Sequence, residues 1–188
     1  MPFCDHLAVT FHRERNPLGS LRALLSDMGA VARDDRTYQL GEGTVKLYVT
    51  YGDLYCSASG AALARMRESG GFMDWLSVIS EWPHRITRLD AAHDVAVDGA
   101  DVLDELRAQY PSGSVNLGRK SLRVKLELAI RDDGRETGTF YVGHRSKARA
   151  TARVYDKRQE RLDRGYPCAG HRTRYEVTVK QDYGATLR

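Results

Sequence analysis

The sequence has few cysteines and no long apolar run. Its three cysteines, Cys4, Cys56 and Cys168, are scattered without a C-x-x-C pair, which argues against a disulfide framework or a zinc knuckle and favours a reducing cytoplasm. No stretch approaches the roughly 18 consecutive apolar residues of a membrane span. The opening residues MPFCDH lack the basic start and apolar core of a signal peptide. We therefore expect a cytoplasmic protein with no membrane partner.

Repeats, low-complexity tracts and linkers rich in proline, glycine and serine are also missing. The chain has 188 residues, of which 41% are hydrophobic and 29% charged, and its mean hydropathy is -0.51. A single domain commonly spans about 100–200 residues, and this composition is typical of a globular protein rather than a disordered or fibrous one. We predict one domain over residues 1–188.

The charge is divided unevenly along the chain. Residues 1–118 hold 11 basic and 16 acidic residues, a net charge of -5, whereas residues 119–174 hold 16 basic and 7 acidic residues, a net charge of +9. A strongly basic segment favours a polyanion such as nucleic acid as partner, although a solvated basic surface would give the same composition.

Apolar periodicity predicts an α+β protein. Strands succeed one another in the second half of the chain as in hairpins, so we expect a mostly antiparallel sheet with helices packed on one face. The predicted strands are 6–12, 37–40, 44–51, 54–57, 84–97, 122–131, 139–142, 151–157 and 171–180. The predicted helices are 17–30, 61–68, 72–82 and 100–110, with a turn or short helix at 159–164.

Two aspartates lie inside the predicted strand 84–97. Asp90 and Asp94 share one side of it, because side chains alternate along a strand, and are roughly 13 Å apart at ~3.3 Å per residue. Asp is disfavoured in strand interiors, so its presence needs a reason. At this distance the two carboxylates cannot both bind one ion directly without a bulge. Solvation at an edge strand or pairing with an arginine is the structural explanation.

The predicted strands 151–157 and 171–180 carry polar side chains on one side. Tyr155 shares its side with Arg153 and Lys157, and a tyrosine with a pKa of about 10 needs such cations, a metal or a base to act as a nucleophile. Cation–aromatic packing on a surface sheet is the structural alternative. The second strand divides into an apolar side and a polar side. The apolar side is Tyr175, Val177 and Val179; the polar side is Arg172, Arg174, Glu176, Thr178 and Lys180.

Four sequence blocks resemble the replication initiation factor family, the rolling-circle initiators of plasmids, filamentous phages and conjugative elements. These blocks are ITRLDAAHD at 86–94, GTFYVGHRS at 138–146, ARVYDKRQER at 152–161 and RYEV at 174–177. Their order matches throughout, and the likeness extends from about Leu54 to Lys180. The second and third blocks together are the most specific.

The resemblance implies a nickase-type nuclease domain that cuts and rejoins origin DNA through a covalent 5′-phosphotyrosine. It places the nucleophile at Tyr155, with Tyr141 as the reserve, and assigns to Lys157 the stabilisation of the phenolate or of the developing phosphorane. Phosphoryl transfer of this kind depends mainly on positioning and on neutralising charge.

The resemblance also implies a divalent cofactor, Mg²⁺ or Mn²⁺, and a set of DNA-binding cations. Asp90 and Glu176 are the first expected metal ligands, and Asp94 and Glu127 the next. Many rolling-circle nickases bind metal through a His-x-His pair, which this sequence lacks, so a carboxylate site is expected instead. The expected DNA-binding residues are Arg145, Lys147, Arg149, Arg153, Arg158 and Arg174.

Other functions stay open at this stage. A DNA-binding replication module without catalysis would keep the basic face, and a metal nuclease that uses water would keep the carboxylates. The partners implied are single-stranded or cruciform origin DNA and a helicase and polymerase of a bacterial host, with a homodimer left open. We expect residues 1–188 to form a single nickase domain, and its truncation at the C-terminus is left open.

Overall fold

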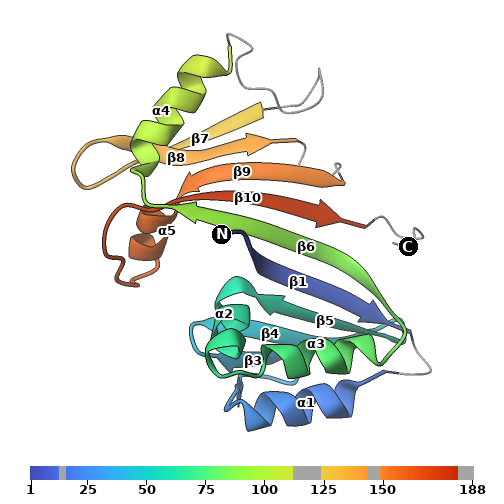
Figure 1. The fold of residues 1–188 in the computed structure, drawn as a ribbon. Helices are drawn as coiled ribbons and strands as arrows, with labels where there is room; N and C mark the ends of the chain where they lie inside the picture. Colours follow the sequence, from blue (N-terminus) through green and yellow to red (C-terminus); the bar gives the residue numbers. More distant parts are fainter. Residues whose placement is uncertain (13–15, 112–123, 144–148, 182–188) are drawn as a thin grey trace. The chain divides into compact units, whose positions relative to one another are not determined.

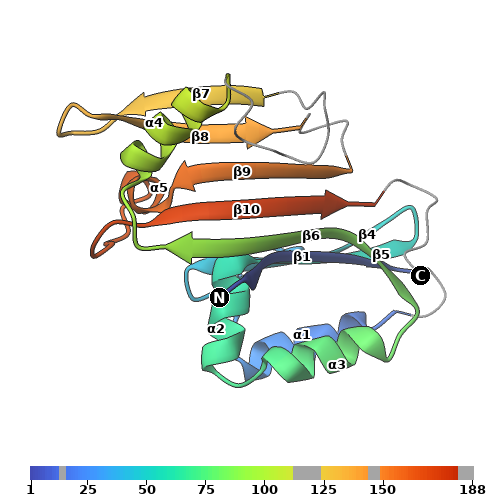
Figure 2. The same cartoon turned by 45° about the horizontal axis from the view of Figure 1, so that its top comes forward.

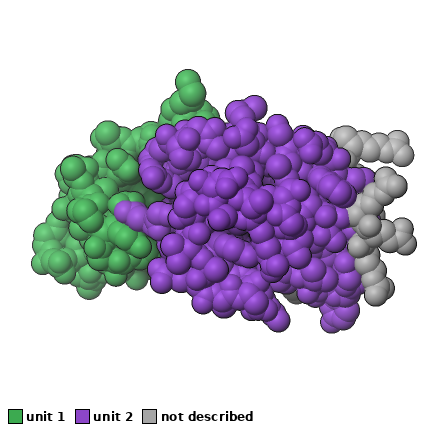
Figure 3. All heavy atoms as spheres, turned by 90° about the horizontal axis from the view of Figure 1, so that it is seen from below, with its two compact units in different colours: residues 1–3, 91–179 green, residues 4–90, 180–188 purple. Residues whose placement is uncertain are grey.

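The computed structural model describes residues 1–12, 16–111, 124–143 and 149–181. The chain divides into two compact units, which Figure 3 colours separately. The C-terminal unit contains residues 1–3 and 91–179, and the N-terminal unit contains residues 4–90 and 180–188. This division by contacts does not test whether either unit folds alone, so the single domain stays a prediction.

The N-terminal unit is a sheet covered by three helices (Figure 1). Its neighbouring strands follow the order β2-β3-β4-β5-β1, and β6 continues the sheet beside β1. The pairs β1/β5, β2/β3, β3/β4 and β4/β5 are antiparallel. The strands are β1 (Phe3–Phe11), β2 (Val31–Ala32), β3 (Thr37–Leu40), β4 (Gly43–Thr50), β5 (Asp53–Ser59) and β6 (His84–Val95), and the helices are α1 (Leu18–Asp27), α2 (Gly60–Glu68) and α3 (Phe72–Ser80).

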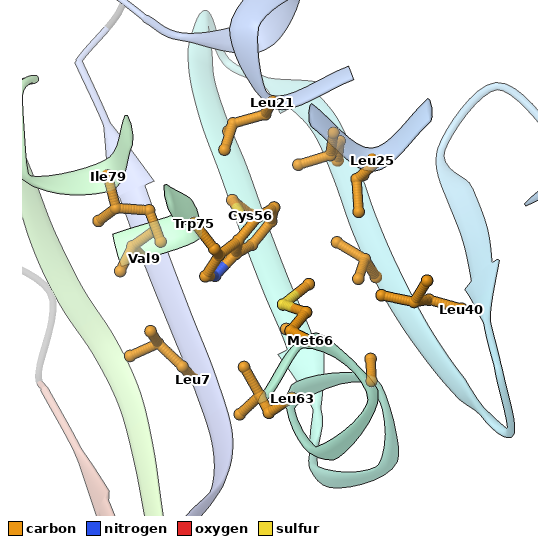
Figure 4. Packing of buried hydrophobic residues seen from close by; sticks show 14 of the residues in the cluster. Leu7, Val9, Leu21, Leu25, Leu40, Cys56, Leu63, Met66, Trp75 and Ile79 are labelled. Carbon is orange, nitrogen blue, oxygen red and sulfur yellow. The ribbon is translucent and has the colours of Figure 1, made fainter. Parts of the chain in front are cut away.

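Apolar packing holds this unit together. Trp75 of α3 is 1% exposed, and Leu25 of α1 and Met66 of α2 are fully buried beside it in one cluster with Val9 and Cys56 of the sheet (Figure 4). The helices therefore present the apolar sides that their sequence spacing predicts, and burial of such side chains is worth about 1.5–3 kcal/mol each.

The C-terminal unit is an antiparallel sheet with α4 packed on one face (Figure 2). Its strand order is β6-β10-β9-β8-β7, with the second half of β6 at one edge. The remaining elements are α4 (Gly99–Gln109), β7 (Val124–Ile130), β8 (Glu136–Val142), β9 (Ala150–Asp156), α5 (Lys157–Asp163) and β10 (Thr173–Lys180). The expected α+β architecture with a mostly antiparallel sheet is confirmed.

The face under α4, which we call the α4 face, holds a small apolar cluster. Leu103 of α4 packs on Phe140 and Val142 of β8. Val154 of β9 is opposite both Phe140 and Tyr175 of β10, so the apolar side of β10 belongs to this same face. That side is 39–45% exposed at Tyr175, Val177 and Val179, whereas Arg174, Glu176 and Thr178 on the polar side are buried.

Most predicted elements are present with shifts of one to a few residues at their ends. The sequence predicts Lys157 as the last residue of strand 151–157, but Lys157 is the first residue of α5. Asp156 caps that helix by accepting a hydrogen bond from the Gln159 amide at 3.0 Å. The short strand β2 was not predicted. Within the described ranges, no helix has the length and apolar character needed to cross a membrane.

Candidate active site

The polar face of the C-terminal sheet, opposite α4, arranges six of the predicted site residues in two adjacent rows across the strands. Strand register sets the first row as Lys125, Tyr141, Arg153 and Glu176, on β7, β8, β9 and β10 in turn. The second row is Glu127, Thr139, Tyr155 and Arg174 on the same four strands. We call this surface the tyrosine face, because Tyr141 and Tyr155 both lie on it, on either side of Arg153.

Tyr155 is held by a carboxylate and by cations. Its hydroxyl donates to Glu176 Oε2 at 3.3 Å. Arg153 grips the same carboxylate with two hydrogen bonds, from Nε at 2.8 Å and Nη2 at 2.7 Å, and its guanidinium carbon lies 4.8 Å from the centre of the Tyr155 ring. The Lys157 ammonium is 5.7 Å from that ring centre. The two cations predicted to flank the tyrosine are therefore in place.

Burial favours the protonated form of the phenol in this arrangement. Tyr155 is 5% exposed, and burial raises its pKa above the ordinary value of about 10. The negative charge of Glu176 raises the pKa further, while Arg174 and Arg153 act in the opposite direction without offsetting the burial. Tyr155 thus needs a proton acceptor at the moment of attack, and Glu176 is already hydrogen-bonded to its hydroxyl.

Every carboxylate predicted as a metal ligand is paired with a cation. Arg174 donates from Nε to Asp94 at 2.6 Å and from Nη2 at 2.9 Å. In the N-terminal unit, Arg88 donates to Asp90 from Nε at 2.9 Å and from Nη2 at 2.5 Å. Glu127 is half exposed and pairs with the neighbouring lysine of β7. Arginine thus neutralises the buried members of the set.

These carboxylates do not form a ready metal centre. Asp90 belongs to the N-terminal unit, and Asp94, Glu127 and Glu176 belong to the C-terminal unit. Among the described residues, no group of three His, Cys, Asp or Glu side chains could hold one ion. Carboxylate oxygens suit Mg²⁺ and Mn²⁺ chemically, but the strong arginine pairs occupy them. We therefore derive no chemical step through a metal.

The predicted DNA-binding cations differ in their surroundings. Arg145 and Lys147 lie outside the described residues. Arg149 is exposed just before β9, and Arg158 is half-buried in α5. The guanidiniums of Arg153 and Arg174 are committed to carboxylates on the tyrosine face, which makes them part of the site itself. Lys157 pairs with Glu160, one turn later in α5.

Sequence analysis missed a second set of polar residues in this unit, an ionic network on the α4 side. Asp98, Arg131 and Asp156 are 8%, 5% and 4% exposed. Asp156 stands inside the most specific sequence block but received no role, and Arg131 is the last residue of the predicted strand 122–131. The aspartate directly before a helix was the available signal, since Asp is a preferred N-cap.

The chain is similar to known proteins at the level of family and of fold. A family model described as a replication initiation factor matches residues 84–186, which contain both rows of the tyrosine face. A comparison with curated proteins found no match.

The fold is also found in a solved structure. A rolling circle replication initiator protein from Geobacillus stearothermophilus is similar over 96% of this chain and 74% of its own length, with 18% sequence identity and a TM-score of 0.63. At that identity the likeness establishes the fold alone. The di-domain ARO/CYC protein BexL of the BE-7585A biosynthetic pathway aligns at 12% identity over 80% of this chain and 65% of its own, but its TM-score of 0.25 is too low to be informative.

The family match covers more than half of the chain, and its range contains all four sequence blocks and the paired tyrosine, arginine and glutamate on β9 and β10. The chain therefore belongs to the replication initiation factor family.

Proposed function

We propose that this protein starts rolling-circle replication by nicking one strand of origin DNA and later rejoining it, with Tyr155 as the nucleophile. The observation that supports this most directly is the contact between the Tyr155 hydroxyl and the buried Glu176 carboxylate. Through this contact Glu176 can accept the proton of Tyr155, which lies in the sequence block ARVYDKRQER at 152–161. The single-stranded or cruciform form of the origin as substrate remains part of the proposal.

The chemistry follows from these two side chains. As the Tyr155 Oη attacks the scissile phosphorus, its proton passes to Glu176; the new bond forms between Oη and phosphorus, and the bond from phosphorus to the 3′ oxygen breaks. The leaving 3′ oxygen takes a proton from solvent, and the 5′ phosphate stays on the tyrosine. Rejoining reverses these steps when a 3′ hydroxyl attacks the phosphotyrosine and Glu176 returns the proton.

Arg153 and Lys157 are assigned to the charge that develops on the phosphate. Arg153 lies on β9 between Tyr141 and Glu176, within reach of whichever tyrosine attacks, and Lys157 flanks the ring of Tyr155. An arginine fork matches a phosphate as well as it matches a carboxylate, so a phosphate can compete with Glu176 for Arg153. The exposed Arg149 and the half-buried Arg158 would then hold the flanking backbone, with binding that weakens steeply with salt.

Divalent Mg²⁺ or Mn²⁺ stays a proposal, and each predicted carboxylate ligand would first have to leave the arginine or lysine that pairs with it. Its test is simple, because cleavage that persists unchanged in chelator would remove the metal from the reaction. A helicase and a polymerase would be needed after the nick, since the duplex must be unwound and the 3′ end extended. A homodimer and a bacterial cytoplasm are likewise proposed.

A covalent-trapping assay tests the proposed function. Labelled single-stranded origin DNA is mixed with the protein, with Mn²⁺ or with chelator, and a shifted band is sought on a denaturing gel. Tyr155→Phe should abolish that band while leaving DNA affinity within about threefold, because the variant loses one hydroxyl and no charge that could bind the DNA backbone. Tyr166→Phe is the matched control, since its ring lies 5.4 Å from the guanidinium carbon of Arg161 but outside the tyrosine face.

Each other outcome assigns a different function. A band lost in Tyr141→Phe but kept in Tyr155→Phe would show that the nucleophile is Tyr141 of β8 rather than Tyr155 of β9. Cutting without a covalent band would indicate a nuclease that uses water. DNA binding without cutting would indicate a replication module that lacks catalysis.

A further inference from the structure

Arg131 lies at the centre of the ionic network on the α4 side of the C-terminal unit. It follows β7 directly and donates from Nε to Asp156 Oδ2 at 2.9 Å, with a second, short contact from Nη2. The same guanidinium reaches Asp98 from Nη1 at 3.1 Å and from Nη2 at 2.5 Å. One buried arginine therefore joins two carboxylates that lie 58 positions apart in the sequence.

Asp156 connects this network to the tyrosine. It is the last residue of β9, directly after Tyr155, and its Oδ2 also accepts from the Thr137 hydroxyl at 3.0 Å. Its Oδ1 accepts from the Gln159 amide at 3.0 Å and so begins α5. The side chain of Asp156 thus fixes the point where the strand carrying Tyr155 becomes the helix carrying Lys157.

Asp98 connects the network to α4. It caps that helix by accepting from the Ala100 amide at 2.9 Å, and Arg135 donates to its Oδ2 at 3.0 Å. The first turn of α4 lies directly on Asp156, because a Cβ added at Gly99 would be 2.5 Å from the Asp156 Cβ. Glycine is therefore required at position 99 for this close approach, although its backbone conformation is one that other residues adopt.

We propose that Arg131 is a positioning residue for the nicking reaction: by holding Asp98 and Asp156 together, it fixes the end of β9 and with it the placement of Tyr155 and Lys157. This inference rests on the proposed function of Tyr155. Without Arg131, the buried Asp156 carboxylate would lose the cation that pairs with it, while Asp98 would keep Arg135. Asp156 would then move away from α4. Displacement of a reacting group by about 1 Å can cost roughly 100-fold in rate.

Substitutions at two positions, Arg131 and Gly99, test the inference by different physical routes. Arg131→Met removes the charge that joins the aspartates, and Arg131→Lys restores a charge without the fork. Gly99→Ala keeps every charge but forces Asp156 to shift. Gly19→Ala on α1 is the matched control, since no atom lies within 4 Å of a Cβ added there.

The measurement separates binding from the chemical step. We expect Arg131→Met and Gly99→Ala to slow covalent adduct formation at saturating DNA by about 100-fold, while the DNA dissociation constant stays within about threefold. Arg131→Lys should recover most of the lost rate, and Gly19→Ala should match the parent protein. A folded Arg131→Met or Gly99→Ala protein with the parent rate would overturn the inference, and so would affinity and rate falling together.

Hydrogen exchange provides a readout that does not depend on catalysis. Amides of residues 155–160 should exchange about tenfold faster in Gly99→Ala, whereas peptides from the N-terminal unit should not change. If the parent protein forms no adduct, the proposed function fails and exchange alone decides the inference. Unchanged exchange at 155–160 in Gly99→Ala would then overturn it. If Arg131→Met does not fold, Gly99→Ala carries both measurements.

Discussion

The two units are stabilised in different ways. In the described parts of the N-terminal unit, three helices bury Trp75, Leu25 and Met66 against a sheet, and apolar side chains dominate the interior. In the C-terminal unit the apolar cluster is small, and arginine–carboxylate pairs lie on both faces of the sheet, at Arg131 on the α4 side and at Glu176 on the tyrosine face. The C-terminal unit thus has less apolar core and more charged groups held at fixed positions, an arrangement that suits the proposed phosphoryl transfer.

Trp75→Ala should have the largest effect on stability. The side chain is 1% exposed within the apolar cluster, so its removal leaves a cavity and should lower the free energy of unfolding by about 3–5 kcal/mol. Urea unfolding followed by circular dichroism measures this loss. Met73→Ala on the same helix is the control, because Met73 is 66% exposed and should change stability by less than about 0.5 kcal/mol. Similar losses of unfolding free energy in the two variants would contradict the conclusion that buried apolar side chains stabilise this unit.

The pair of Arg153 and Glu176 should behave differently from an apolar core. Arg153→Met leaves Glu176 buried without its cation and should cost about 3 kcal/mol. The double variant Arg153→Met, Glu176→Leu should recover stability to within about 1 kcal/mol of the parent, because apolar groups can replace a buried ion pair. Thermal unfolding gives the stabilities, and the trapping assay should detect no adduct from the double variant. Recovery of both stability and adduct formation would refute the role of Glu176 as proton acceptor.

Acid should weaken the C-terminal unit through Asp98. Hydrogen bonds from Arg131 are the largest cause that lowers the pKa of Asp98 to about 2, against an ordinary value near 3.9. The folded state therefore releases this proton more readily than the unfolded state, and stability on the order of 2 kcal/mol is present above pH ~4 and lost as the pH falls toward 2. Unfolding free energies at pH 7, 4 and 2.5 measure the loss. In Asp98→Asn the same pH range should produce a smaller change, and an unaltered pH profile would contradict the assignment.

Val177→Thr should have the smallest effect. The side chain lies on the apolar side of β10 and is 45% exposed, so a polar replacement of similar shape should change stability by no more than about 0.5 kcal/mol. Thr178→Val, one residue further on the buried polar side, is the sharper comparison, because it removes a buried hydroxyl. The melting temperatures of the two variants show which one loses more stability. A larger loss for Val177→Thr would contradict our assignment of the polar side of β10 as the buried side.

The elements were predictable because their signals are local. Helical spacing located α1, α2, α3 and α4, and alternation located nearly every strand, including the division of β10 into two sides. Alternation does not say which side is buried, however, because that depends on what packs against the strand. The two-residue strand β2 has too short a pattern to be detected from the sequence alone.

The site was predictable in composition and only partly in arrangement. Tyr155, Arg153 and Glu176 were all chosen from sequence, but their direct contact depends on the register of β9 with β10, which no local pattern encodes. The pairing of Asp94 with Arg174 joins residues 80 positions apart. The network of Asp98, Arg131 and Asp156 joins three elements in the same way, so only the fold reveals it.

Strand β10 buries its polar side and partly exposes its apolar side, and this has an evolutionary consequence. Substitutions accumulate where they cost little, and on this strand those positions are Tyr175, Val177 and Val179, which are apolar and partly exposed. The polar positions 174, 176 and 178 should instead resist change, because each buries a group that needs its partner. Over long divergence, the strand should therefore keep its charged residues and drift in its hydrophobic ones, the opposite of what a strand on an apolar core does.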